Sequence, residues 1–133
     1  MAFAGKWVFE KNEKMKEFAV AAGAPPEKVD QMIDVPITVE CTRDGDYYLM
    51  SFTGPKNKTV VQKFKPDEPF TEEIGPFGKT RVAIAKVEGD KMAIRGVKEG
   101  EAVEKREVIG DEMIFTFVKP GIPFVAKRYL KRA

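Results

Sequence analysis

Turn-forming residues divide the chain at intervals of roughly ten residues, and this spacing limits the fold more than any other feature of the sequence. The turn segments are built around Gly, Pro and Asp, at 44–45, 54–55, 66–67, 75–78, 89–90, 99–100, 110–111 and 120–121. Short segments of alternating apolar and polar character, such as 47–52 and 113–118, lie between them. Short strands joined by tight turns at this spacing are typical of an antiparallel all-β sandwich or barrel.

The number of strands favours a barrel with space inside. We expect about ten strands, from a first near residues 5–11 to a last near residues 122–131. No linker or low-complexity segment divides them, so we expect a single domain over residues 1–133. An antiparallel sheet of about ten strands closed on itself encloses more volume than its own side chains fill, which leaves a ligand cavity.

Residues 14–34 interrupt the strand pattern. Met15, Phe18 and Ala22 fall on one face of a short helix. Pro26 is suited to the first position of a second helix, because proline lacks the N–H that a helix start leaves unpaired. A helical pair inserted after the first strand can cover the open end of a barrel, so we expect a helical lid at about 14–34.

The composition argues against several classes of protein. The chain has no histidine, which removes the commonest general base and the usual transition-metal ligand. Cys41 is the single cysteine, so neither an intramolecular disulfide nor a multi-cysteine zinc site can form. The net charge of +2 is too small to suggest a nucleic-acid partner. With no signal-peptide pattern and no membrane-length apolar run, we expect a cytoplasmic protein without enzymatic activity, cofactor or metal.

Four segments resemble one known family in order, spacing and total length. They are Phe-Ala-Gly-Lys-Trp at 3–7, the helix-to-glycine segment 18–23, Lys-Arg-Glu-Val at 105–108 before a Gly-Asp turn, and 127–131 at the end. Together they make the chain similar to the intracellular lipid-binding proteins, which include fatty-acid-, retinoid- and bile-acid-binding members. The resemblance implies an all-β, ten-stranded antiparallel up-and-down barrel of the calycin/lipocalin type, capped by a short helix-turn-helix and holding lipid inside.

The same resemblance implies where a lipid carboxylate would be held. Family members that bind carboxylates use an interior arginine on the eighth strand and an Arg-x-Tyr pair on the last strand. Arg106 matches the first arginine and Tyr129 matches the tyrosine, whereas Lys127 stands where the second arginine is expected. Lysine keeps the positive charge but loses the planar fork that holds a carboxylate with two hydrogen bonds.

Alternation along the last strand does not choose between its two faces. Lys127 and Tyr129 share one face, and Ala126, Arg128 and Leu130 share the other, so each face carries one basic group. The family register turns Lys127 and Tyr129 inward. A slip of one residue would instead turn Arg128 inward.

Two acidic segments affect the prediction for the interior. Arg106 shares its strand face with Glu104, so the residues alone also allow a solvent-exposed ion pair, and the orientation of Glu104 stays open. The pair Glu72 and Glu73 is interpreted as a charge cluster in a loop, where nothing raises a carboxyl pKa. Five apolar side chains are expected to contact the lipid tail or line the portal, although core packing explains them as well: Met15, Phe18, Met32, Phe115 and Phe117.

The sequence and the resemblance together predict a non-enzymatic intracellular carrier. It binds a long-chain fatty acid in the barrel interior, with the carboxylate held by Arg106, Lys127 and Tyr129. A retinoid or a bile acid in the same fold is the alternative, and a protein-interaction module with a filled interior is more distant. We expect a monomer whose lid contacts anionic membranes transiently, although ordinary solvated lysines explain the same residues: Lys14, Lys16 and Lys28.

Overall fold

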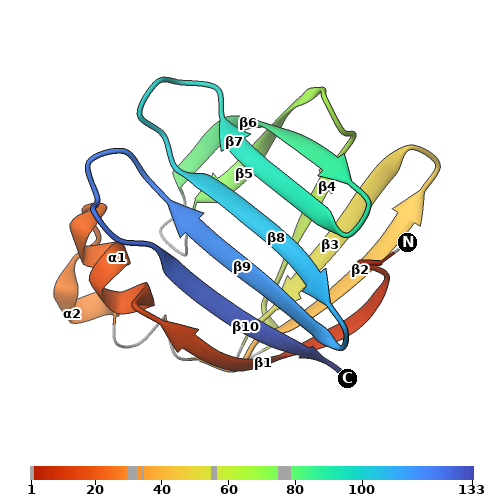
Figure 1. Cartoon of the computed structure of the whole chain (residues 1–133), viewed down its shortest axis with the longest axis horizontal. Coiled ribbons are helices and arrows are strands. Elements are labelled where there is room, and N and C mark those ends of the chain that lie inside the picture. Colours follow the sequence, from red (N-terminus) through yellow and green to blue (C-terminus); the bar gives the residue numbers. More distant parts are fainter. Residues whose placement is uncertain (1, 30–32, 34, 55–56, 75–78) are drawn as a thin grey trace.

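The protein is a β-barrel with two short helices at one end (Figure 1). The computed structural model describes residues 2–29, 33, 35–54, 57–74 and 79–133. Over these residues the helices are α1 (Met15–Ala21) and α2 (Pro26–Val29). The strands are β1 (Gly5–Glu13), β2 (Thr38–Asp44), β3 (Tyr47–Thr53), β4 (Thr59–Phe64), β5 (Pro69–Ile74), β6 (Lys79–Glu88), β7 (Lys91–Gly96), β8 (Val103–Ile109), β9 (Glu112–Val118) and β10 (Ala126–Arg132).

All ten of these strands form one antiparallel sheet. Its order is β4-β3-β2-β1-β10-β9-β8-β7-β6-β5, so the first and last strands of the chain pair in the middle of the sheet. Strands β4 and β5 stand at its two ends, with no hydrogen-bonded ladder between them in the described segments. Side chains span this gap, since the rings of Phe64 and Phe70 stack with centroids 5.1 Å apart. The expected ten-stranded, nearly closed barrel is confirmed.

Glycine sets the tight turns between three pairs of neighbouring strands. Gly45, Gly89 and Gly110 each open a two-residue Gly-Asp turn, with φ of 61°, 61° and 59°. Positive φ carries little cost for glycine, and turns of this kind match the twist of the strands they join. Three of the turn segments seen in the sequence are therefore the turns of tight β-hairpins.

The interior of the barrel is lined by alternate residues of the strands. Its fully buried members include Trp7, Val39, Met50, Ile94 and Leu130, which belong to one continuous apolar cluster. The Trp7 indole N–H donates to the carbonyl oxygen of Phe3 at 3.0 Å, which satisfies its polar atom inside the core. This cluster fixes which face of each strand points inward.

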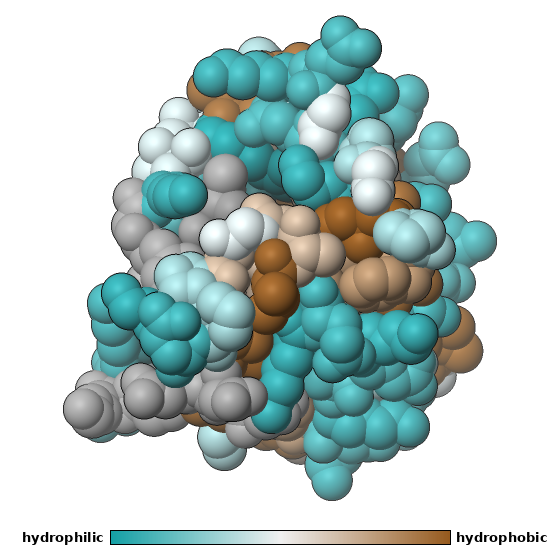
Figure 2. Space-filling view, turned by 90° about the vertical axis from the view of Figure 1, so that its left-hand side faces the viewer, coloured by the Kyte–Doolittle hydropathy of each residue, from teal (hydrophilic) through white to brown (hydrophobic). Residues whose placement is uncertain are grey.

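The helices lie at one end of the barrel, where α1 packs through a second, smaller apolar cluster. Met15 and Phe18 of α1 are buried with Ala126, and half-buried Ile33, Phe117, Ile122 and Phe124 pack around them. The first helix ends before Gly23, whose φ of 106° is the conformation that stops a helix. Figure 2 views the molecule from this end and shows apolar side chains in its middle with hydrophilic ones around them.

The predicted helical segment is confirmed for the residues that the structure describes. Residues 15–29 hold both helices, and Pro26 opens the second one. The remainder of the expected lid, residues 30–32 and 34, lies outside the described residues. Neither helix has the length and apolar character needed to cross a bilayer, as far as the described residues extend.

Candidate functional site

Arg106 lies in the interior of the barrel, where its side chain is 1% exposed. Alternation along β8 turns Glu104, Arg106 and Val108 inward. The Arg106 Nη2 donates to Glu104 Oε2 at 2.7 Å and to Gln62 Oε1, on the opposite side of the barrel, at 2.9 Å. Its Nη1 lies 2.9 Å from the sulfur of Met50. The orientation of Glu104 is thereby settled: it points inward and pairs with Arg106.

Aromatic rings flank the same guanidinium. The central carbon of the Arg106 guanidinium lies 4.8 Å from the ring centroid of Phe115 and 5.5 Å from that of Phe52. The two rings meet edge to face, with centroids 6.3 Å apart. Attraction between a cation and a ring face strengthens where water is excluded, so these rings stabilise a charge that burial disfavours. Arg106 Nε is buried without a hydrogen-bond partner among the described residues.

A second buried ion pair lies on neighbouring strands of the barrel. Arg81 Nε donates to Glu72 Oε1 at 3.1 Å, and Arg81 Nη1 donates to the carbonyl oxygen of Ala102 at 2.7 Å. Burial raises the pKa of Glu72, and the negative charge of Glu104 raises it further, while Arg81 and Arg106 act in the opposite direction. The prediction for Glu72 was therefore wrong: it belongs to β5 and not to a loop, and its carboxyl pKa is perturbed. Strand alternation could have revealed this, because Glu72 lies two residues from half-buried Phe70 and therefore shares its strand face.

Arg128, and not Lys127, faces the interior from β10. Ala126 and Leu130 are fully buried on either side of Arg128, so alternation puts Arg128 on the same inward face. Arg128 Nε donates to Asn12 Oδ1 at 3.2 Å, across the β1–β10 ladder. Arg128 also pairs in register with Phe115 on β9.

Register brings the two arginines to the same level of the barrel. Phe115 pairs with Arg128 on one side and with Arg106 on the other. The two guanidinium-bearing residues are thus two strands apart on one inner face, with the ring of Phe115 between them.

The expected inward orientation of Lys127 and Tyr129 is corrected by this register. Both belong to the opposite face of β10, where Lys11 Nζ lies 4.8 Å from the Tyr129 ring centroid. Slight burial and the neighbouring Glu13 carboxylate raise the pKa of Tyr129. The inward residues Arg128 and Leu130 have the spacing of the family's Arg-x-Tyr pair, with leucine in place of tyrosine. The structure therefore has the alternative register that the sequence left open, in which Arg128 points inward.

Three of the expected tail and portal residues, Met15, Phe18 and Phe117, lie where the first helix meets the barrel. Phe115 is buried, and half-buried Phe117 belongs to both apolar clusters. The ring of Phe18 lies 6.3 Å from that of Phe117 and 6.4 Å from that of Phe124. Met15 is buried beside Phe18, so packing onto the barrel rim is its observed role, and contact with a lipid tail stays a prediction. Met32 lies outside the described residues.

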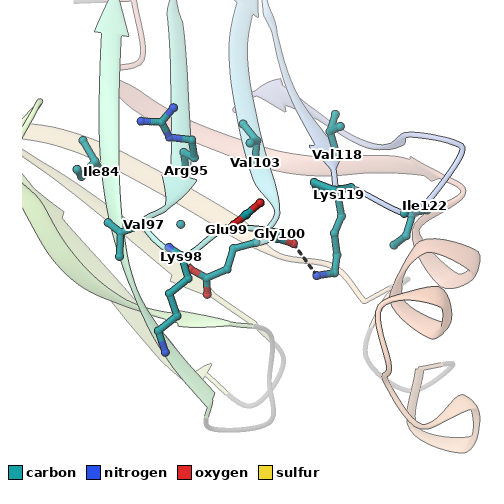
Figure 3. Close-up of a pocket in the computed structure, with 14 residues that line it drawn as sticks. Ile84, Arg95, Val97, Lys98, Glu99, Gly100, Val103, Val118, Lys119 and Ile122 are labelled. Atoms are coloured by element: carbon teal, nitrogen blue, oxygen red, sulfur yellow. Dashed lines mark hydrogen bonds between the residues drawn. The ribbon is translucent and has the colours of Figure 1, made fainter.

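A separate hollow of about 700 Å³ lies on the outer wall (Figure 3). The loops after β7 and β9 border it, and Lys119 Nζ donates to the carbonyl oxygen of Gly100 at 3.0 Å across its mouth. Its wall residues Ile84, Val103 and Val118 belong to the strand faces opposite to the barrel interior. This groove is therefore distinct from the site around Arg106. The described residues hold no group of three acidic or cysteine side chains that could bind a metal.

Comparison with known proteins agrees with this architecture. A family model described as the lipocalin / cytosolic fatty-acid binding protein family matches residues 1–125. The chain belongs to this family. It is 28% identical to fatty acid-binding protein 2 of Manduca sexta over 134 residues, covering 98% of this chain and 99% of that protein. It is also 28% identical to gastrotropin of Rattus norvegicus over 115 residues, covering 86% of each.

Solved structures of family members have the same fold. The Schistosoma mansoni fatty acid binding protein in complex with arachidonic acid matches with a TM-score of 0.88 and 25% identity, covering 99% of this chain and 96% of that one. The fatty acid-binding protein from brain tissue of Drosophila melanogaster matches with a TM-score of 0.84 and 25% identity, covering 97% and 98%. The ten-stranded barrel with its helical cap, in which Arg106 and Arg128 lie, is thus the fold of these relatives as well.

Proposed function

We propose that the protein binds a long-chain fatty acid reversibly in the barrel interior and carries it in the cytoplasm, without chemistry on the ligand. The observation that carries this proposal is Arg106, a cation buried among apolar side chains in a family barrel. Relatives named as fatty acid-binding proteins match the chain over almost its full length, which supports the same ligand class here.

The driving force would come from the hydrocarbon tail. Burial of ~15 methylenes at about 0.8 kcal/mol each gives roughly 12 kcal/mol of gross stabilisation. Ordering and association oppose much of this, so submicromolar affinity is expected. A carboxylate cannot be buried unpaired. Arg106 and Arg128 would hold it, with Arg128 taking the role that the sequence assigned to Lys127.

Ligand exchange would occur at the helical end. Helix α1 packs on that end of the barrel through a small cluster that includes Met15 and Phe18. A cluster of this size can open without disrupting the larger core, so exchange is gated by local motion of the cap. Motion of this kind requires no catalytic group.

The test is displacement of Nile red, an uncharged hydrophobic dye, from delipidated protein by oleate and by its methyl ester. We expect oleate to displace the dye at one equivalent per chain and the ester to bind at least tenfold more weakly. The variant Arg106→Gln should lose most of this preference, whereas Arg95→Gln, on the exposed outer side of β7, should keep it.

Other outcomes assign the interior differently. Equal competition by oleate and the ester would refute the carboxylate site while leaving a lipid cavity. Stronger displacement by retinol or by a bile acid would indicate that alternative ligand. Failure of both the dye and every lipid to bind would point to a filled interior and an interaction module.

A further inference from the structure

Asn12 connects the last strand of the barrel with Ile33, a residue that follows the second helix. Its Oδ1 accepts from Arg128 Nε at 3.2 Å, and its Nδ2 donates to the carbonyl oxygen of Ile33 at 2.8 Å. A side-chain amide accepts through its oxygen and donates through its nitrogen, so both bonds require the same orientation of the Asn12 amide. The two contacts are therefore made together and not as alternatives.

An irregularity in β1 turns Asn12 toward the interior. Trp7 is fully buried in the core, and strict alternation from Trp7 would put Asn12 on the opposite face. The β1–β10 register shifts between Phe9 and Lys11, which changes the alternation by one residue and brings Asn12 opposite Arg128. The contact between Asn12 and Arg128 thus depends on this shift.

Ile33 takes part in the packing of the helical cap. Its half-buried side chain packs against the cluster that contains Met15 and Phe18 of α1. Its N–H donates to the carbonyl oxygen of Val29, the last residue of α2, at 3.1 Å. Through Ile33, Asn12 is therefore linked to both helices, which lie at the end of the barrel where we expect the ligand to exchange (Figure 1).

Building on the proposed function, we propose that Asn12 is a positioning residue that couples the ligand carboxylate to closure of the helical cap. A guanidinium is a rigid planar fork, so a carboxylate held by the Nη nitrogens of Arg128 fixes the direction of its Nε–H. This Nε–H in turn holds the Asn12 amide in the orientation that bonds Ile33. An ionised headgroup thus stabilises the closed cap, whereas an uncharged headgroup holds Arg128 less firmly and stabilises the cap less.

The test measures hydrogen exchange of the Ile33 amide by NMR at one pH, in the ligand-free protein and with an excess of oleate or of methyl oleate. Both ligands have the same tail, so a difference between them reports the effect of the carboxylate. A hydrogen bond between two amide groups changes a local opening equilibrium by about two- to tenfold. We expect exchange at Ile33 to be slower with oleate than with methyl oleate by this factor.

Variants separate this coupling from a purely structural role of Asn12. In Asn12→Ala and in Arg128→Met, the ratio of the two exchange rates should fall to one. A structural role alone would raise exchange at Ile33 by the same factor with either ligand and would leave the ratio unchanged. The matched control is Lys11→Ala, at the neighbouring exposed position on the outer face of β1, and it should keep the ratio of the unaltered protein.

Each result separates this proposal from the proposed function. If bound oleate slows exchange at Ile33 in the unaltered protein no more than methyl oleate does, the coupling is overturned while fatty acid binding stands. A ratio that persists in Asn12→Ala also overturns it, because the carboxylate then acts on the cap by another route. Failure of oleate to bind refutes the proposed function itself.

Discussion

Arg128→Met and Lys127→Met provide a direct test of the last-strand register, because the two residues are neighbours on β10 but face opposite ways. The first variant removes an interior guanidinium, and the second removes an ammonium from the outer face. A hydrogen bond to a charged group contributes about 1.5–3 kcal/mol. Since about 1.4 kcal/mol corresponds to a factor of ten, Arg128→Met should raise the Kd for oleate by roughly 10- to 150-fold. Lys127→Met should change it less than about twofold.

Stability has to be measured beside affinity in this experiment. Arg128→Met also removes the bond to Asn12 Oδ1, 3.2 Å from Arg128 Nε, and a bond with a charged donor contributes about 1.5–3 kcal/mol to folding. Thermal unfolding of both variants shows whether each remains folded at the assay temperature, and methyl oleate shows whether the cavity is retained. A loss of oleate affinity in Lys127→Met equal to or larger than that in Arg128→Met would refute the register argument.

Three further changes have defined expected outcomes. Folding raises the pKa of Glu72 from its ordinary value of 4.5. The contribution of this carboxyl to folding stability is therefore fully present below pH 4.5 and is lost as the pH rises through the raised pKa. Urea unfolding at several pH values should therefore show the unaltered protein losing stability relative to Glu72→Gln above pH 4.5. Leu130→Ala should cost about 2–5 kcal/mol in urea unfolding, because Leu130 is fully buried, whereas exposed Lys131→Ala should change stability by less than about 0.5 kcal/mol. Burial raises the pKa of Cys41 to about 11, so this thiol should react with a disulfide reagent at pH 8 only as fast as the barrel opens, and immediately in guanidinium chloride.

The fold could be predicted from the sequence because its signals are local. Each Gly-Asp turn forces a hairpin through the positive φ of its glycine, and the spacing of Met15 and Phe18 is a helical period within one short segment. Apart from β4 and β5, strands that are consecutive in the chain then pair with each other. These signals predict the strands, the hairpins and the cap, whereas the choice of an up-and-down barrel over a sandwich came from the number of strands and the family resemblance.

The site was harder to predict because it depends on register between strands far apart in the chain. Both faces of β10 carry a basic residue, so alternation alone could not tell Lys127 from Arg128, and matching Tyr129 to the family's tyrosine selected the face that lies outside. The pairing of Arg128 with Asn12 is set by the β1–β10 ladder, which contains an irregularity between Phe9 and Lys11. No pattern within a single strand records such a shift.

The strand order has a further consequence for how quickly the barrel can assemble. All but one of the pairings join strands that are consecutive in the chain, whereas β1 and β10 are separated by more than a hundred residues. The last residue nevertheless bonds beside the first strand, with the Ala133 N–H donating to the carbonyl oxygen of Lys6 at 2.9 Å. A circular permutant with these ends joined and new ends between β4 and β5 would contain only pairings between consecutive strands. Its contact order would be much lower, so the same barrel should fold faster from this rearranged chain.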